Sequence, residues 1–186
     1  MAIKAIGVIT ENPQDGKHIK VDWTRVTPAK EWYGAGVLRQ TVHYVSSDEN
    51  YITAVTFAGQ KHENIHIPSD AVPGNCPVFE QTKDWLTQYF EGHIPNFLPP
   101  IKPIGTPFQQ SVWKRLLEIP YGETVTYGEL AKHLECHSAQ AVGGAVGRNP
   151  ISILIPCHRV VGTDGKLTGY AWGIDRKQWL LNHEKN

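Results

Sequence analysis

An apolar run is interrupted by a proline and by three chemically active side chains in the stretch Ile153-Leu154-Ile155-Pro156-Cys157-His158-Arg159-Val160-Val161. Arginine is almost never buried without a partner. Pro156 cannot donate a ladder hydrogen bond, so an extended run must break or reach an edge there. We therefore predict that this β-like segment brings the Cys157 thiol to the wall of a pocket. For an isolated Cys-His pair, a core cysteine beside a surface histidine is an equally good interpretation, because free cysteines are often buried.

Length and composition indicate an ordinary soluble globular protein. The 186 residues suffice for one domain or for a small domain joined to a medium one, with 40% hydrophobic and 19% charged residues. No apolar stretch is long enough for a signal peptide or a membrane span. The three cysteines are an odd number without CxxC spacing, so we expect a reducing cytoplasm, no disulfide framework, no metal and no cofactor.

Charge is distributed unevenly although the net charge is zero. Residues 1–100 contain 8 Lys+Arg and 11 Asp+Glu, whereas residues 101–186 contain 10 and 7. Most such differences reflect solvated surface, but this one directs any polyanionic partner to the C-terminal half.

The first part of the chain is typical of β-strands. Segments rich in Val, Ile, Thr and Tyr, separated by turn residues, predict strands at Ile3–Ile9, His18–Trp23, Val37–Val45, Tyr51–Phe57 and His62–Ile67. His62 and His66 share a strand face and with His43 imitate a metal site, but solvated strand histidines are the default interpretation.

A helix and a proline-rich segment end this half. Pro77 to Glu91 has an apolar stripe formed by Val78, Trp85, Leu86, Tyr89 and Phe90, and Gly92 ends it. Residues 95–105 contain four prolines and cannot form a regular element. We therefore place a strand-rich domain at 1–94, a linker at 95–105 and a second domain at 106–186.

Three capping-box patterns predict helix starts in the second domain. They begin at Thr106 (with Phe108, Val112, Trp113, Leu116 and Leu117 inward), Thr126 (with Leu130, Ala131 and Leu134 inward) and Asp175 (with Trp179, Leu180 and Leu181 inward). Ser138 starts a further short helix of small residues. The helices at about 127–134 and 139–146 have the proportions of a helix-turn-helix. Tight helix–helix packing explains the small residues equally well.

Together these residues resemble the DNA O6-alkylguanine alkyltransferases, or methylated-DNA–protein-cysteine methyltransferases. The matching segments are Gly105–Gln109 with Val112-Trp113, Tyr121–Tyr127, Ala141–Gly144, Asn149-Pro150, Pro156–Val161, Gly169-Tyr170 and Trp179–Glu184. The match covers residues 77–186, while residues 1–76 match only in being strand-rich. The resemblance implies an α/β plus mostly α fold, with a small ribonuclease-H-like N-terminal domain and a helical C-terminal domain that holds the helix-turn-helix and the cysteine segment.

The resemblance implies direct reversal of DNA damage. An alkyl group on O6 of guanine, or O4 of thymine, in duplex DNA would pass to Cys157 after the nucleotide is flipped out from the minor groove. His158 would be the base acting through a water, Glu184 its orienting carboxylate, and Tyr127 the donor to the leaving oxygen. The thioether product is not hydrolysed as a thioester would be, so one turnover per molecule is expected.

The same resemblance supplies the remaining site residues and the partner. The substrate-binding positions are Asn149, Arg159, Val160, Tyr170, Ala171 and Trp172. The DNA-binding positions are Thr126, Ser138, Ala139, Gln140, Ala141, Gly143 and Gly144. The expected partner is double-stranded DNA containing O6-alkylguanine. We expect the protein to bind it as a monomer and not to associate with a membrane.

Three positions depart from the better-known family pattern. Gln140 stands where an arginine usually fills the gap left by the flipped base, which predicts weaker or more salt-tolerant DNA binding. Ala171 replaces a serine, and backbone donation to O6 can survive that change. Trp172 replaces a glycine, so we expect poor tolerance of benzyl-sized adducts.

Two other functional classes stay open. A non-catalytic damage sensor or helix-turn-helix regulator would not need the cysteine, so Cys157 argues against it. A cysteine hydrolase using Cys157 and His158 would require turnover and an acyl substrate. Transfer of one methyl group per chain from methylated DNA separates the three classes.

Overall fold

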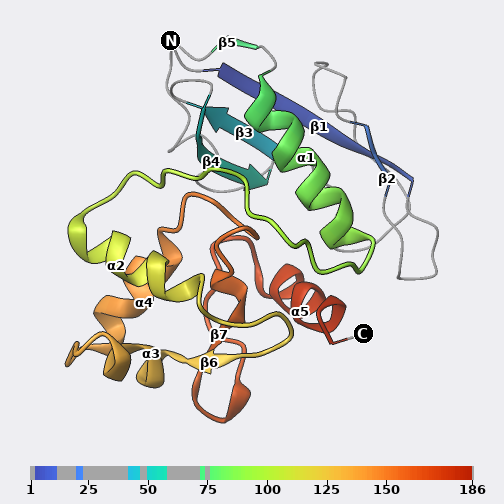
Figure 1. The fold of residues 1–186 in the computed structure, drawn as a ribbon. Helices are drawn as coiled ribbons and strands as arrows, with labels where there is room; N and C mark the ends of the chain where they lie inside the picture. Colours follow the sequence, from blue (N-terminus) through green and yellow to red (C-terminus); the bar gives the residue numbers. More distant parts are fainter. Residues whose placement is uncertain are drawn as a thin grey trace. The chain divides into compact units, whose positions relative to one another are not determined.

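The structure is a computed structural model that describes residues 3–11, 20–22, 42–46, 50–57, 72–73 and 76–185. The chain divides into two compact units, Met1–Lys102 and Pro103–Asn186. The division lies inside the proline-rich segment 95–105. Figure 1 shows the strands and one helix of the first unit, and the helical second unit in yellow to red.

The first unit is built on a mostly antiparallel sheet with strand order β2-β1-β3-β4, in which β5 pairs parallel to β1. The strands are β1 (Ile3–Glu11), β2 (Lys20–Asp22), β3 (Val42–Ser46), β4 (Ile52–Phe57) and β5 (Val72–Pro73). Four of the five predicted strands are thereby confirmed with shifted ends. The fifth, at His62–Ile67, lies outside the described residues, as do the side chains of His43, His62 and His66. The ribonuclease-H-like topology stays a prediction.

Helix α1 (Pro77–Phe90) confirms the helix expected after the strands, with Pro77 in its first turn. The predicted apolar stripe is buried, and Thr82 on the same face donates its hydroxyl to the Val78 carbonyl at 2.7 Å. Gly92 follows the helix at φ +83°, a conformation that glycine adopts without steric cost.

The proline-rich segment is not irregular throughout. The Ile52 N–H donates to the Pro100 carbonyl and the Lys102 N–H to the Ile52 carbonyl, both at 2.8 Å, so residues around Ile101 form one parallel bridge with β4. This bridge is isolated and Ile101 lies outside any helix or strand, so the expectation that residues 95–105 form no regular element is confirmed. A β-bridge needs only two main-chain bonds and tolerates flanking prolines.

The described part of the second unit contains four short α-helices and two 3-10 turns around a two-stranded parallel pair. Its elements are α2 (Pro107–Leu116), β6 (Val125–Thr126), α3 (Tyr127–His133), α4 (Ala139–Gly147), the 3-10 turn η1 (Cys157–Arg159), β7 (Val160–Val161), the 3-10 turn η2 (Thr163–Gly165) and α5 (Ile174–His183). The pairing of β6 with β7 sets Val125 beside Val160. As a result, the first residue of α3 lies next to the end of the cysteine segment (Figure 1).

Three of the four predicted helix starts are confirmed. Thr106 with Gln109 and Thr126 with Glu129 form reciprocal capping boxes, and the Ser138 hydroxyl accepts from the Ala141 N–H at 3.1 Å. These caps satisfy N–H groups that have no partner inside the helix.

The start of α5 was predicted wrongly. It begins at Ile174 after Gly173, which has φ +90° and makes no side-chain cap, so Asp175 lies in the first turn. This offset changes the buried face: Lys177 is buried with Leu180 and Leu181, whereas Trp179 is half-buried. Phe108 in α2 and Leu117, which directly follows this helix, are 39% and 38% exposed, although we expected both side chains to point inward.

Candidate active site

A tight turn before Cys157 is held by the side chain of Asn149. Its amide nitrogen lies 2.9 Å from the Ile155 carbonyl and 3.3 Å from the Ile151 carbonyl, and its oxygen accepts from the Ile151 N–H at 3.0 Å. Within this turn Ile153 has φ +70°, which is strained for a β-branched residue. Such strain persists only where surrounding bonds impose it, and Asn149 supplies those bonds.

The Cys-His-Arg triplet forms a 3-10 turn and not the extended segment that was expected. Pro156 precedes this turn, and the Arg159 N–H donates to the Pro156 carbonyl at 3.0 Å. Adjacent side chains therefore diverge around a tight helix rather than across a strand. Cys157 and Arg159 are 3% and 9% exposed, and His158 is fully buried.

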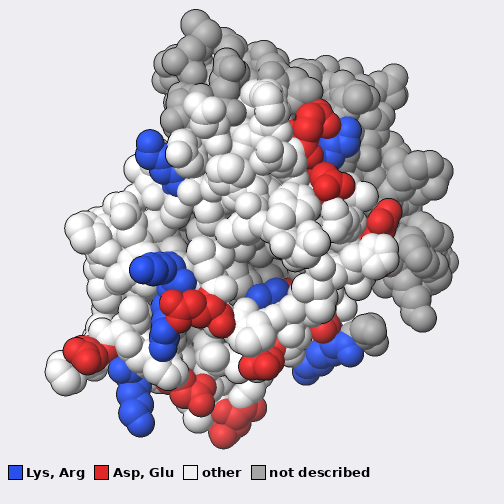
Figure 2. All heavy atoms as spheres, in the orientation of Figure 1, with Lys and Arg blue, Asp and Glu red and all other residues white. Residues whose placement is uncertain are grey.

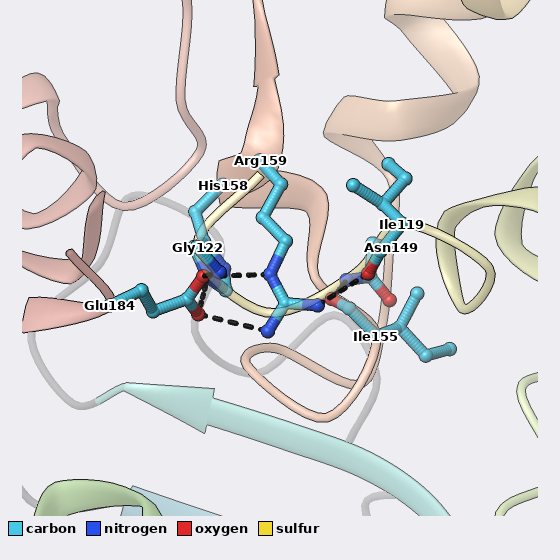
Figure 3. Close-up of polar contacts among 7 residues, drawn as sticks. All are labelled: Ile119, Gly122, Asn149, Ile155, His158, Arg159 and Glu184. Atoms are coloured by element: carbon cyan, nitrogen blue, oxygen red, sulfur yellow. Dashed lines mark hydrogen bonds and ion pairs between the residues drawn. The ribbon is translucent and has the colours of Figure 1, made fainter. Parts of the chain in front are cut away.

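His158, Arg159 and Glu184 form a buried charge network (Figure 3). His158 Nε2 lies 2.6 Å from one Glu184 carboxylate oxygen, while Arg159 contacts both oxygens, with Nε at 2.7 Å and Nη2 at 3.0 Å. Arg159 Nη1 also donates to the Ile119 carbonyl at 2.7 Å. The partner that a buried arginine requires is therefore the carboxylate at the end of α5.

The backbone of Gly122 completes the ring of donors around Glu184. Its N–H donates to the second carboxylate oxygen at 3.2 Å, and its φ is +77°. A Cβ added there would lie 2.8 Å from the Glu184 carbonyl oxygen. Only glycine fits both the conformation and the close approach.

Burial and this network together set the protonation of the imidazole. Burial alone would raise the pKa of Glu184, but the hydrogen bonds and charges of His158 and Arg159 hold that pKa well below its usual range. Burial lowers the pKa of His158 despite its bond to Glu184. The imidazole is therefore neutral and donates its proton from Nε2, and His158 Nδ1 has no hydrogen-bond partner among the described residues.

The Cys157 thiol has three polar neighbours. Asn149 Nδ2 lies 3.1 Å from the sulfur. Burial raises the thiol pKa, whereas the Asn149 contact, the charge of Lys177 and the Tyr170 hydroxyl lower it. Asn149 thus serves the turn and the sulfur with one side chain.

Two tyrosines and a lysine line the same site. Tyr127, at the start of α3, places its hydroxyl 3.4 Å from the Gly169 carbonyl, and burial and the Cys157 charge raise its pKa. The pKa of Tyr170 is raised well above its usual range by the same two causes. Lys177 Nζ lies 5.8 Å from the Tyr127 ring centroid and 5.9 Å from that of Tyr170.

The structure brings the four expected catalytic residues and Asn149, Arg159, Val160 and Tyr170 into one unit of the fold. Val160 and Trp172 are buried, whereas Ala171 is exposed. Of the expected DNA-binding residues, Ala139, Gln140 and Ala141 are exposed on the first turn of α4, and Thr126 and Ser138 act as helix caps. Gly143 and Gly144 are half-buried, and a Cβ on Gly143 would lie 3.6 Å from the Tyr127 ring.

Sequence reasoning missed Lys177 and Gly122 as parts of the site. A signal for Lys177 exists: residues 177, 180, 181 and 184 share one helix face, so an inward lysine and glutamate flank two inward leucines. For Gly122 no local signal exists, because its partner comes from the far end of the chain.

Charge on the face drawn in Figure 2 is mixed, with Lys and Arg interspersed among Asp and Glu over the second unit. Within the described ranges no group of three or more His, Cys, Asp or Glu could hold a metal ion. A search of those same residues finds no helix long and apolar enough to cross a membrane.

Sequence comparisons with known proteins find matches to one family. The sequence model of the 6-O-methylguanine DNA methyltransferase DNA-binding domain matches residues 107–186. A methylated-DNA–protein-cysteine methyltransferase of Methanosarcina mazei is 52% identical over 121 residues, 64% of this chain and 76% of that protein. The enzyme of that name from Haemophilus influenzae is 45% identical over 143 residues, 76% of this chain and 79% of its own length.

Solved structures of the same family are similar to this one. The Mycobacterium tuberculosis OGT structure in complex with DNA has a TM-score of 0.70 and 41% identity, covering 78% of this chain and 86% of that one. The O6-methylguanine-DNA methyltransferase of Pyrococcus kodakaraensis has a TM-score of 0.62 and 31% identity, covering 83% and 96%. The chain therefore belongs to the methylated-DNA–protein-cysteine methyltransferases, DNA-repair enzymes that transfer an alkyl group from DNA to a cysteine.

Proposed function

We propose that Cys157 accepts one alkyl group, from O6 of guanine or O4 of thymine in duplex DNA, and is not regenerated. The observation that carries the proposal is the orientation of the neighbouring imidazole. His158 is bonded through Nε2 to Glu184 at 2.6 Å, and its Nδ1 is left without a partner among the described residues. An unprotonated, buried ring nitrogen in the residue that follows a buried thiol suits a general base that acts through a water.

The chemistry needs a thiolate because the reaction is displacement at a saturated carbon. The Cys157 proton passes to His158 Nδ1 through a bridging water, and the imidazolium is stabilised by the ionised Glu184. Arg159, which contacts Glu184 and the Ile119 carbonyl, acts by positioning that carboxylate. The sulfur–carbon bond forms as the carbon–oxygen bond breaks, and the product is a stable thioether.

The leaving oxygen requires a proton donor, and Tyr127 fits this role. Its raised pKa keeps the phenol protonated at neutral pH, and it lies at the start of α3 close enough to Cys157 for their charges to interact. The carbonyl of Val160, together with residues 170–172, supplies the wall against which the purine rests.

Access to Cys157 supports base flipping. A sulfur in a residue that is 3% exposed cannot reach a carbon inside a base stack, so the nucleotide must rotate out of the duplex. We propose that α3 and α4 form a helix-turn-helix and that α4 enters the minor groove. Val142, Ala145 and Val146 face the core, and the small residues of its first turn face solvent.

Gln140 is exposed on that first turn and is the residue we propose to fill the gap left by the base. It can bond to the orphan cytosine but brings no charge, so DNA affinity should depend less on salt than with arginine. A Gln140→Arg variant is expected to bind DNA more tightly and with a steeper salt dependence. Unchanged affinity and salt slope would contradict this role.

The deciding experiment incubates the full chain with duplex DNA containing one O6-methylguanine. The expected result is a mass increase of one methyl group on the peptide that contains Cys157, at one equivalent per chain, and none in Cys157→Ser. Tight binding without transfer would identify a damage sensor. Continued turnover would identify a hydrolase. Sedimentation of the DNA complex tests the further proposal that the protein acts as a monomer.

A further inference from the structure

Lys177 is a buried cation without a carboxylate partner in the described part of the chain. It is 0% exposed on the inner face of α5. Its Nζ donates to the Val160 carbonyl at 2.5 Å and to the Thr168 carbonyl at 3.1 Å, and it lies near the rings of Tyr127 and Tyr170. Among the described residues, no Asp or Glu forms an ion pair with it.

Such a charge is costly to bury. Carbonyl oxygens and aromatic faces compensate an ammonium group only in part, and lysine is almost never fully buried unless it is paired. The Glu184 carboxylate is already occupied by His158 and Arg159. The remaining acids in this part of the site are Cys157, Tyr127 and Tyr170.

Of these three acids, the thiol ionises most readily, since a cysteine in water loses its proton below a tyrosine. We propose that Lys177 is the counter-ion of the Cys157 thiolate, a positioning residue for the reaction that also holds the Val160 carbonyl in place. The inference rests on the proposed function, in which that thiolate is the nucleophile. It adds the group that stabilises the anion once His158 has taken the proton.

The net charge of the site groups stays the same through the reaction, and with Lys177 in this role each new anion has a cation near it. Before transfer, Arg159 and Glu184 cancel, His158 is neutral and Lys177 is unmatched. Moving the proton from Cys157 to His158 creates the imidazolium, which faces Glu184, and the thiolate, which faces Lys177. When the sulfur–carbon bond forms and the carbon–oxygen bond breaks, the negative charge leaves on the purine oxygen, which takes a proton from Tyr127 and leaves a Tyr127 phenolate near Lys177. Lys177 keeps its proton throughout.

The groups that influence the ionisation of the Cys157 thiol come from four segments. They are Asn149 before the turn, Tyr127 on α3, Tyr170 in the following loop and Lys177 on α5. Burial raises the pKa of the thiol, and the Asn149 amide and the Lys177 charge oppose it. Reciprocally, burial lowers the pKa of Lys177 and the Cys157 charge raises it.

The test measures ionisation of Cys157 without DNA. The rate of iodoacetamide alkylation is followed across pH, and peptide mass spectrometry separates Cys157 from Cys76 and Cys136. The variants are Lys177→Met, which removes the charge, Lys177→Gln, which keeps a donor for the two carbonyls, and Lys177→Arg, which keeps the charge. Lys114→Met, at an exposed position on α2, is the matched control.

We expect the midpoint of Cys157 alkylation to rise by about one pH unit or more in Lys177→Met and Lys177→Gln, which is about a tenfold loss of thiolate below both midpoints. Lys177→Arg should stay near the wild type and Lys114→Met should match it. Methyl transfer by Lys177→Gln should be slow at neutral pH and recover at higher pH, which a purely structural role would not produce.

A folded Lys177→Gln or Lys177→Met protein whose Cys157 ionises at the wild-type midpoint overturns the inference. So does failure of both neutral variants to fold, since that assigns Lys177 to the fold alone. Methyl transfer by the wild type is measured in parallel. If the wild type transfers the methyl group while the midpoint is unmoved, the inference about Lys177 falls and the proposed function stands. If the wild type does not transfer the methyl group, the proposed function is refuted, whatever the Cys157 midpoint does.

Discussion

Replacement of Asn149 by alanine removes the side chain that holds the turn before Cys157. Asn149 is 4% exposed, and its amide nitrogen has three acceptors within 3.3 Å for only two hydrogens, so the bonds are shared. The Ile155 carbonyl keeps a second donor in the Cys157 N–H, and the Ile151 carbonyl keeps the Ile155 N–H. The group that loses its acceptor is the Ile151 N–H.

The free-energy cost follows from this inventory. One orphaned buried N–H costs about 1–3 kcal/mol, and each lost bond to a carbonyl that stays satisfied costs about 0.5–1.5 kcal/mol. The one orphaned N–H and the two lost carbonyl bonds together predict a loss of about 2–6 kcal/mol, a large share of the stability of an ordinary domain. Loss of the contact to sulfur should also raise the Cys157 pKa. Release of the strained Ile153 should displace the thiol, so methyl transfer should slow by about a hundredfold.

Urea unfolding of Asn149→Ala measures the first effect, and single-turnover methyl transfer measures the second. Asn96→Ala, at an exposed position between α1 and α2, is the matched control and should change stability by less than about 0.5 kcal/mol. An Asn149→Ala protein within about 1 kcal/mol of the wild type would refute the assignment of the turn to this side chain.

Three further predictions concern the same site. The pKa of His158 in the folded protein lies below its ordinary 6.5 and that of Glu184 below 4.5, so the unfolded chain binds more protons than the folded one. The free energy of unfolding should therefore fall as the pH drops below 6.5, and further below 4.5, by up to about 1.4 kcal/mol per pH unit for each proton. Urea midpoints that stay constant between pH 6.5 and 4.5 would be inconsistent with this. Gly122→Ala should lower the Tm and slow methyl transfer, because the new Cβ would lie 2.8 Å from the Glu184 carbonyl oxygen. The control Gly92→Ala has φ +83° but open space around the new Cβ, so it should lower the free energy of unfolding by only about 1–2 kcal/mol. Equal losses of stability in the two variants would show that the close approach at Gly122 is unimportant. Trp172→Gly should increase the rate of reaction with free O6-benzylguanine more than with methylated DNA, and a wild-type protein that already reacts efficiently with the benzyl compound would remove the basis for this expectation.

The sequence alone determined three helix starts, at Thr106, Thr126 and Ser138. It also determined the buried stripe of α1. The physical reason is that caps and amphipathic stripes depend on residues three or four positions apart. The adjacency of Cys157 and His158 is likewise covalent, so the proposed nucleophile and the proposed base could be named from the sequence once the family resemblance was recognised. The start of α5 was mispredicted because an acidic residue in a first turn and a true N-cap look alike in sequence.

Only the tertiary structure decided which charges are buried and what they contact. Arg159 meets Glu184 from the opposite end of the cysteine segment, Gly122 donates to the same carboxylate, and Lys177 points inward from a helix whose composition suggests an exposed lysine. Burying a charge is acceptable only where distant segments supply donors, acceptors or a counter-ion. Those segments come together because β6 pairs with β7 and α5 packs against the 3-10 turn η1. No local sequence pattern encodes these long-range contacts.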